Sequence, residues 1–377
     1  MGWSQCLNDA RQLSGYTTGS YQSAVFMTQF WSAVTKGLSP YVPGEQPRVP
    51  NLIKLNTNEH ALTPSLKALQ AIADHAADAL RRYPDPNGSN LVQAIAELEG
   101  LSPENVFVGN GSDEILAHAF QGLLTSAEAL ITPDITYSFY PVWANLYGLE
   151  HCKVPLNQDF SVDIDGLCRT DGAVLLANPN APTGMTVELH EIERLISSKP
   201  ERLVVIDEAY FGFGAVSASQ LLGSHQNLLI TRSLSKSHAL AGLRVGYALG
   251  SRDLIEGLRR IKDSFNSYPL DALAQVGAEA ALRDTDWLNE ASRLIIENRA
   301  FVSEKLEGLE FVVCPSQANF LFAEHPNVSG KLLFEGLRER NILVRRWDYP
   351  RIDNHLRITV GTRDQCMMLV EVLSEMV

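Results

Sequence analysis

Cysteine is scarce in this chain. Its 377 residues include five cysteines, which are odd in number and form no Cys-x-x-Cys pair: Cys6, Cys152, Cys168, Cys314 and Cys366. Scattered single cysteines argue against a disulfide framework and a structural zinc site, so we expect no metal and a reducing, cytoplasmic compartment. No apolar run approaches the roughly 20 residues of a membrane span, so no membrane partner is expected. The first residues lack a basic segment followed by an apolar core, so no signal peptide is expected.

Basic side chains are also in the minority. Lysine and arginine number 31 against 44 aspartates and glutamates, which gives a net charge of −13. This balance argues against nucleic acid as a partner, although a local group of arginines can still bind an anionic small molecule. No Gly-x-Gly-x-x-Gly follows the first strand of a strand–helix–strand unit, which disfavours a plain nucleotide-binding α/β protein.

Strands and helices alternate over the first two thirds of the chain. The apolar runs at 173–177 and 203–206 are typical of strands buried on both faces, and apolar residues recur at helical spacing in 64–82. This alternation predicts an α/β fold, with a mostly parallel sheet sandwiched by helices. After about residue 270 a long helical stretch over 271–306, followed by short strands and helices, predicts a smaller α+β domain. The predicted parts are an extension (1–26), an N-terminal arm with the first strand (27–63), a large domain (64–270) and a small domain (271–377).

Lys236 lies in a stretch that combines a nucleophile with anion-binding groups. It follows the apolar run 228–230, and a lysine near the end of a buried strand has a lowered pKa, so its amine becomes a usable nucleophile. Ser233, Ser235 and Arg244 supply the hydroxyl donors and the guanidinium that hold a phosphate dianion. A solvated loop lysine is the ordinary alternative. The Ser-x-x-Lys spacing also matches serine β-lactamases, but the chain lacks the Ser-Asp-Asn and Lys-Thr-Gly of that set.

Two further strand ends carry polar groups. The turn Gly111-Ser112-Asp113 lies between a predicted strand and a predicted helix, where free N–H groups and the helix dipole favour an anion. Asp207 and Tyr210 follow the buried strand 203–206. A buried carboxylate at a strand end can keep a pyridine nitrogen protonated, so these sites together with Lys236 predict pyridoxal phosphate as the cofactor. Taken singly, Asp207 is an ordinary helix cap or ion-pair partner, and 109–114 is an ordinary capped turn.

The chain resembles the fold-type I pyridoxal-phosphate aminotransferases and, within them, the histidinol-phosphate aminotransferase family. The resemblance covers about residue 30 to the C-terminus. The matching segments are LSPYVPG (38–44), RYPDP (82–86), GNGSDE (109–114), DEAY (207–210), SLSK (233–236), AGLR (241–244) and LRITVGT (356–362).

The resemblance implies a role for each site residue. Lys236 carries the cofactor as a Schiff base, Asp207 pairs with the pyridine nitrogen, and Tyr210 donates to the ring hydroxyl. The other implied cofactor-binding residues are Tyr137, which stacks on the ring, Gly111, Ser112, Asp113, Ser233, Ser235 and Arg244 around the phosphate, and Tyr83, which reaches the phosphate from a partner subunit. The implied substrate-binding residues are Tyr41, Asn58, Arg345 and Arg357. The family forms homodimers whose active sites lie at the interface.

Two positions depart from the family pattern. The asparagine that usually precedes Pro-Thr-Gly is Ala181 here, so either its neighbour Asn180 or Tyr210 alone would bond to the ring hydroxyl. The usual Asn-Glu-Asn-Pro after the first strand is replaced by Asn58-Glu59-His60-Ala61. That loop approaches the substrate in the family.

The implied reaction converts histidinol phosphate and 2-oxoglutarate to imidazole-acetol phosphate and glutamate, a step of histidine biosynthesis. The expected partners are therefore small molecules, namely a phosphorylated amino alcohol and the 2-oxoglutarate/glutamate pair, and a second copy of the chain. An aromatic amino-acid aminotransferase and a phospho-amino-acid decarboxylase are alternatives on the same fold. A pyridoxal-binding sensor domain of a regulator is disfavoured, because residues 1–26 are too short and insufficiently basic for a DNA-binding module.

Overall fold

The computed structural model describes residues 30–47, 49–75 and 80–377. The chain divides into two units, residues 1–39 and 40–377. The described part of the first unit contains the short helix α1 (Ala33–Gly37), which begins where the Ser32 hydroxyl accepts a hydrogen bond from the Thr35 N–H at 3.1 Å. The predicted extension, 1–26, lies outside the described residues.

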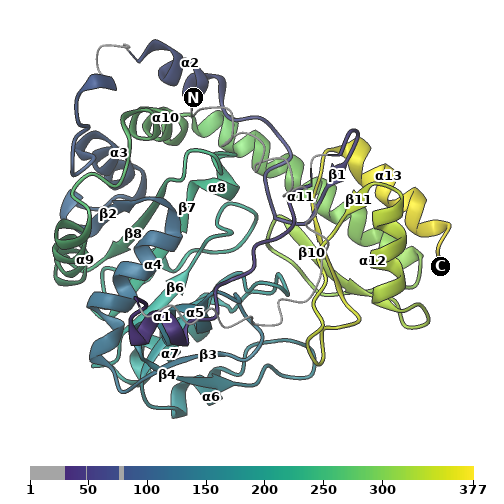
Figure 1. Ribbon diagram of the computed structural model, residues 1–377, viewed down its shortest axis with the longest axis horizontal. Coiled ribbons are helices and arrows are strands. Elements are labelled where there is room, and N and C mark those ends of the chain that lie inside the picture. The colour runs from purple at the N-terminus through teal and green to yellow at the C-terminus, as the bar shows by residue number, and fades with distance from the viewer. Residues whose placement is uncertain (1–29, 48, 76–79) are drawn as a thin grey trace, which may run out of the picture. The chain divides into compact units, whose positions relative to one another are not determined.

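Seven strands of the second unit form one sheet, in the order β2-β8-β7-β6-β5-β3-β4 (Figure 1). Strand β8 is antiparallel to both of its neighbours, and the other six strands share one direction. The strands are β2 (Val106–Gly109), β3 (Ala129–Pro133), β4 (Glu150–Val154), β5 (Ala173–Ala177), β6 (Val204–Asp207), β7 (Leu228–Ser233) and β8 (Gly246–Gly250). The carboxyl ends of β6 and β7 therefore lie side by side, with Asp207 opposite Thr231.

Successive residues of the central strands enter two different cores. In β5, Leu175 packs into one core and Leu176 into the other, and Val205 and Ile206 of β6 divide in the same way. The core around Leu176 contains residues of α2 (Leu66–Asp74), α3 (Ser89–Glu99), α6 (Ile164–Arg169), α7 (Leu189–Ser198), α8 (Leu234–Ser237) and α10 (Ala272–Leu282), and the core around Leu175 contains residues of α4 (Gly111–Gly122), α5 (Tyr140–Tyr147) and α9 (Arg252–Phe265). Burial on both faces explains the unbroken apolar runs of these strands. The predicted α/β class is confirmed.

A separate core joins the last third of the chain to its first strand. Strands β9 (Val312–Val313), β10 (Phe320–Glu324) and β12 (Leu356–Thr359) form an antiparallel sheet, and β1 (Ile53–Lys54) pairs in parallel with β11 (Ile342–Leu343). Residues of α11 (Thr285–Gly308), α12 (Gly330–Glu339) and α13 (Arg363–Ser374) complete this core (Figure 1). The pairing of β1 with β11 brings residues 55–59 close to β12, which matters for the site below.

The long helical stretch predicted over 271–306 is wrong in one respect, because it consists of two helices. The break falls at Asp284, whose backbone φ of −94° and ψ of 62° leave the helical region, and its carboxylate binds the Lys67 ammonium of α2 at 2.7 Å. Helix α10 contributes Ala274 and Ala278 to the core around Leu176, whereas α11 contributes Ile295 to the core of the last third. The residue at which the small domain begins stays a prediction.

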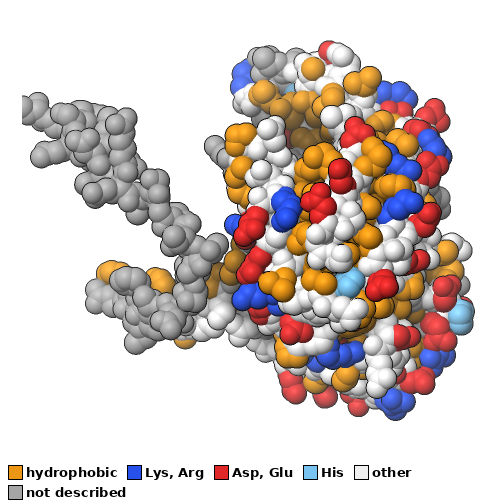
Figure 2. Space-filling view, turned by 90° about the vertical axis from the view of Figure 1, so that its right-hand side faces the viewer, with side chains coloured by type: hydrophobic (Ala, Val, Ile, Leu, Met, Phe, Trp, Pro, Cys, Tyr) orange, Lys and Arg blue, Asp and Glu red, His pale blue; other side chains and the backbone are white. Residues whose placement is uncertain are grey.

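The surface carries charges of both signs. On the face drawn in Figure 2, acidic and basic side chains are interspersed with each other and with hydrophobic ones. None of the helices in the described ranges is both long and apolar enough to cross a bilayer.

Candidate active site

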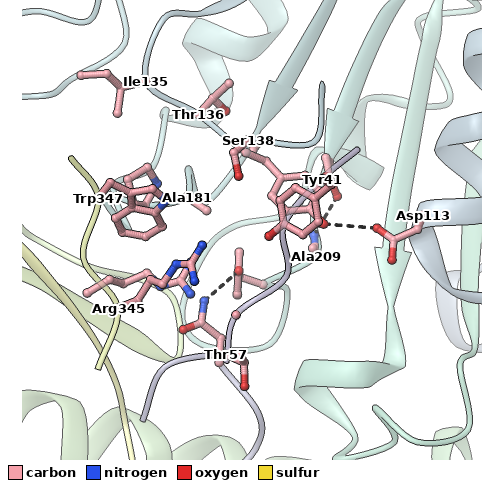
Figure 3. Close-up of a pocket in the computed structure, with 18 of the residues that line it drawn as sticks. Tyr41, Thr57, Asp113, Ile135, Thr136, Ser138, Ala181, Ala209, Arg345 and Trp347 are labelled. Atoms are coloured by element: carbon pink, nitrogen blue, oxygen red, sulfur yellow. Dashed lines mark hydrogen bonds between the residues drawn. The ribbon is translucent and has the colours of Figure 1, made fainter. Parts of the chain in front are cut away.

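A cavity of about 420 Å³ lies at the carboxyl ends of the sheet strands, where open α/β sheets bind their ligands. Its lining includes most of the residues singled out from the sequence: Tyr41, Asn58, Ser112, Asp113, Tyr137, Asp207, Tyr210, Ser233, Ser235, Lys236, Arg244, Arg345 and Arg357. Figure 3 shows Asp113 at one end of this pocket and Arg345 with Trp347 at the other. The Arg244 guanidinium, which donates to Asp113, and the Arg345 guanidinium therefore lie at opposite ends of the pocket.

Lys236 is held at the junction of β7 and α8. Its Nζ donates to the Thr57 carbonyl oxygen at 3.2 Å. Burial, with a smaller contribution from the Arg357 and Arg244 cations, lowers the pKa of Lys236 to about 8, while Glu59 and Asp113 oppose that shift. A substantial fraction of this amine is therefore unprotonated and nucleophilic near pH 8.

Asp207 ends β6 and is almost completely buried. Its carboxylate accepts hydrogen bonds from the Tyr140 hydroxyl at 2.7 Å, the Thr231 hydroxyl at 3.2 Å and the Ala209 N–H at 3.2 Å. Burial raises the pKa of Asp207 to about 6, and these three donors limit the rise. Such a carboxylate is suited to a cationic partner in the pocket, because a positive charge would relieve the unfavourable burial of the anion.

The N-terminus of α4 forms one wall of an anion cradle. Its N-cap residue, Asn110, makes no side-chain capping hydrogen bond within the described part of the chain, and Gly111 has a φ of +77°. Arg244 spans the cradle, since its guanidinium donates to Asp113 at 3.1 Å and to the Ser235 hydroxyl at 3.4 Å. A Cβ added at Gly111 would lie 2.7 Å from Nη2 of Arg244, so the backbone can approach this guanidinium only as glycine. Helix N–H groups, a serine and an arginine are groups that can hold a phosphate.

Two arginines face the opposite end of the pocket. Arg345 and Arg357 are paired across an antiparallel bridge with N···O distances of 3.0 and 2.8 Å, so their side chains leave the same face. Both guanidinium groups lie over the Trp347 ring, at 5.5 and 5.1 Å from its centroid. Arg357 donates to the Asn56 carbonyl oxygen at 2.9 Å, while its buried Nε has no partner among the described residues. Neither arginine forms an ion pair with a described carboxylate, so this end is suited to an anionic ligand.

Three residues singled out from the sequence do not line the pocket: Gly111, Asn180 and Tyr83. Gly111 lies beside it under Arg244. The Asn180 amide donates to the Ile135 carbonyl oxygen at 3.0 Å and to Thr183 at 3.3 Å and accepts from Thr136 at 2.8 Å, so its hydrogen-bonding groups are engaged within the protein. Tyr83 is 81% exposed and stacks on Tyr268 at 4.6 Å. Their predicted roles stay predictions.

Several site residues escaped the sequence analysis. Tyr140 and Thr231 bind Asp207, Trp347 supports both arginines, and the Thr57 carbonyl accepts from Lys236. Trp347 carried a usable signal, because it lies two residues after Arg345 and alternate residues of an extended segment share a face. A backbone carbonyl carries no residue-type signal at all.

These groups fit pyridoxal phosphate, which has an aldehyde for Lys236, a pyridine nitrogen for Asp207 and a phosphate for the α4 cradle. The described residues contain no group of three or more histidine, cysteine or acidic side chains that could hold a metal ion. The model of the family described as aminotransferase class I and II matches residues 50–373. The chain belongs to this aminotransferase family. Pyridoxal phosphate is the cofactor of the family, so the predicted cofactor class is confirmed.

The aminotransferase has close relatives along nearly its whole length. It is 54% identical to the histidinol-phosphate aminotransferase of Gluconacetobacter diazotrophicus, over 92% of this chain and 98% of that relative. It is 52% identical to histidinol-phosphate aminotransferase 1 of Bradyrhizobium diazoefficiens, over 93% of this chain and 100% of that relative. The expected family membership is therefore confirmed.

Solved structures share the fold. The histidinol-phosphate aminotransferase of Clostridium acetobutylicum has a TM-score of 0.80 at 23% identity and covers 86% of this aminotransferase and 99% of that chain. The enzyme of Sinorhizobium meliloti, solved in complex with pyridoxal-5'-phosphate, has a TM-score of 0.78 at 24% identity over 86% of this chain and 92% of that chain. These likenesses establish the fold.

Proposed function

We propose that this aminotransferase transfers the amino group of histidinol phosphate to 2-oxoglutarate, giving imidazole-acetol phosphate and glutamate, with pyridoxal phosphate attached to Lys236. The observation that carries the proposal is the second anion-binding end of the pocket. Arg345 and Arg357 face it without a described carboxylate partner, and the α4 cradle is left for the cofactor phosphate. The names of the close relatives support the choice of substrate.

The arginine end suits both substrates in turn. A phosphate monoester and a dicarboxylic 2-oxo acid each present an anionic group at one end and the reacting carbon at the other. Planar guanidinium groups bind either anion through bidentate hydrogen bonds. Because Trp347 supports both arginines, it keeps the two guanidinium groups near each other despite their like charge. We also assign Tyr41, which lines the same pocket, to substrate binding.

The cofactor would be held by groups that the fold brings to one sheet edge. We assign its phosphate to the first turn of α4 at Gly111, Ser112 and Asp113, together with Ser233, Ser235 and Arg244. We assign its ring to Tyr137 on one face, Asp207 at the nitrogen and Tyr210 at the hydroxyl. When bound, its protonated ring supplies an electron sink for the pair released at the reacting carbon. Asp207 supports this by favouring a proton on the ring nitrogen.

Lys236 has two tasks in the proposed mechanism. Its Nζ would hold the cofactor covalently at the aldehyde, and it would be free whenever a substrate amine occupies that position. The released Nζ then removes the proton from the substrate carbon that bears the amino group, as a general base. Its pKa of about 8 suits this task, because much of the amine is unprotonated near that pH while it remains basic enough to accept a proton. The Thr57 carbonyl, 3.2 Å away, accepts a hydrogen bond from the free amine.

Replacing Lys236 tests the proposal directly. Lys236→Ala should lose the lysine-linked absorption band and reduce turnover with histidinol phosphate by at least about 10³-fold, because both the covalent link and the base are removed. Borohydride reduction of the wild-type holoenzyme, followed by peptide mapping, should place the label on residue 236. Lys199→Ala, at a surface lysine paired with Asp171, is the matched control and should behave as wild type. Near-normal turnover in Lys236→Ala would contradict the assignment.

A substrate panel decides among the related activities. Single turnovers should be fastest with histidinol phosphate as the amine donor and 2-oxoglutarate as the acceptor. Faster turnover of phenylalanine would instead indicate an aromatic amino-acid aminotransferase. Release of carbon dioxide from a phospho-amino acid without need of 2-oxoglutarate would indicate a decarboxylase.

We further propose that the enzyme works as a cytoplasmic homodimer in which Tyr83 of each copy reaches the phosphate site of the other. Support comes from exposed aromatic side chains outside the pocket: Tyr83 is 81% exposed, Phe265 73% and Tyr268 41%. Large exposed aromatics of this kind are typical of interfaces. The four described cysteines are unpaired, which agrees with a reducing compartment.

A further inference from the structure

A chain of hydrogen bonds runs from the end of β12 to the ring of Tyr210. The Thr359 hydroxyl donates to Oδ1 of Asn58 at 3.0 Å, and Nδ2 of Asn58 donates to the Tyr210 hydroxyl oxygen at 2.9 Å. All three residues are buried, and Asn58 is only 1% exposed. Asn58 was expected to bind substrate, but its side-chain amide is engaged in these hydrogen bonds with Thr359 and Tyr210.

The direction of each bond in the chain follows from its first member. The Thr359 hydroxyl oxygen accepts the backbone N–H of Asn58 at 3.0 Å, so its own proton is available for Oδ1 of Asn58. With Oδ1 facing Thr359, the NH₂ group must face Tyr210. The phenol oxygen of Tyr210 then serves as the acceptor, and its proton is directed away from Asn58. Tyr210 lines the pocket, and its hydroxyl has no other partner among the described residues, so this proton is free to point at a ligand.

The backbone around Asn58 is fixed in the geometry that this series of hydrogen bonds requires. Asn58 has a φ of +56°, a left-handed conformation that asparagine tolerates better than most residues. Its carbonyl oxygen accepts from the buried Asn319 amide at 3.0 Å. The Tyr210 ring packs edge-on against Phe320, at 4.9 Å between ring centroids. Asn58 and its acceptor Tyr210 are thus both held in place by contacts from residues 319 and 320.

We propose that Asn58 and Thr359 are positioning residues that orient the Tyr210 hydroxyl, so that it donates its proton to the ring oxygen of the bound cofactor. The inference rests on the proposed function, because it takes pyridoxal phosphate as the ligand. It explains how the site can still hydrogen-bond the ring oxygen with Ala181 at the position where the family usually has asparagine. With the Asn180 amide engaged elsewhere, one well-oriented phenol takes over the contact to the ring oxygen. Burial raises the pKa of Tyr210, which keeps that proton on the phenol.

The proposal has a spectroscopic consequence. The lysine-linked cofactor changes its absorption when the nitrogen of the link loses its proton, and the neighbouring anionic ring oxygen retains that proton. A hydrogen bond donated to the ring oxygen weakens this retention, so the proton leaves at lower pH. Losing the donor, or turning it away, should therefore raise the apparent pKa of the absorbance change.

The test is a pH titration of the absorbance of the holoenzyme and its variants. Tyr210→Phe should raise the apparent pKa by about one pH unit, as expected for a hydrogen bond to a charged group. Thr359→Val and Asn58→Gly should raise it in the same direction, and glycine suits the left-handed backbone at that position. Thr359→Ser keeps the hydroxyl and should titrate as wild type. In the Tyr210→Phe background, Thr359→Val should add no further shift.

Two results would overturn the inference: an unchanged apparent pKa in both Thr359→Val and Asn58→Gly, or an undiminished shift from Thr359→Val in the Tyr210→Phe background. A wild-type protein that forms no lysine-linked band with pyridoxal phosphate would overturn the proposed function itself, together with this inference. The two failures are therefore distinguishable in one set of titrations.

Discussion

At the residue scale, the buried Asp207 carboxylate suits the bound cofactor but destabilises the folded protein when the cofactor is absent. Burial raises its pKa to about 6, above the value of about 4 in an unfolded chain. The folded state therefore retains the Asp207 proton to higher pH than the unfolded state. The stabilisation linked to that proton is complete below about pH 4 and is lost as the pH rises through about 6.

Asp207→Asn should accordingly stabilise the cofactor-free protein at pH 7.5, on the order of 2 kcal/mol, with the difference vanishing near pH 4. The same variant should lose most of its turnover, because an amide cannot balance a protonated pyridine nitrogen. Urea unfolding at both pH values measures the first effect. Asp171→Asn is the control, since the hydrogen bond from Lys199 lowers the pKa of that exposed carboxyl, so its substitution should not stabilise. Equal stability of Asp207→Asn and wild type at pH 7.5 would contradict the argument.

At the element scale, the N-terminus of α4 depends on a backbone conformation that glycine adopts readily. Gly111→Ala would strain a φ of +77° and bring a methyl group to 2.7 Å from the Arg244 guanidinium. We expect the Kd for pyridoxal phosphate to rise at least about tenfold, because the arginine must leave the phosphate site. Equilibrium titration of the apoprotein with pyridoxal phosphate measures this Kd.

The chain offers a matched control for that variant. Gly148 has a similar φ of +69° with no atom within 4 Å of an added Cβ. Gly148→Ala should therefore lower stability by about 1 kcal/mol while leaving cofactor affinity unchanged. If both variants weakened the affinity equally, backbone strain rather than the clash with Arg244 would be the cause.

At the scale of the whole molecule, the proposed dimer predicts complementation between two defective chains. Lys236→Ala and Tyr83→Ala homodimers should each be weakly active, since every site lacks one group. A heterodimer of the two would contain one site with both groups intact and one site that lacks both. Refolding an equal mixture should therefore restore about a quarter of wild-type turnover, because half of the dimers are mixed and each has one good site. Activity no higher than the mean of the separate variants would show that Tyr83 acts within its own chain.

The sequence by itself determined the elements and groups that depend on local order along the chain. Unbroken apolar runs predicted strands buried on both faces, and the residues just beyond those strands, Asp207 and Lys236 among them, predicted the cofactor edge. Strand ends of one sheet meet wherever the strands are parallel, so these predictions needed no knowledge of distant contacts.

The tertiary structure alone decided the contacts between distant segments. Asn58 and Thr359 are 301 positions apart, and their bond exists only because residues 55–59 lie against β12. The same applies to the Thr57 carbonyl oxygen that accepts from Lys236, 179 positions away. The Asp284 carboxylate likewise binds Lys67, which lies 217 positions earlier in the chain. Pairings at such separations follow from how the cores pack, and local residue patterns do not encode them.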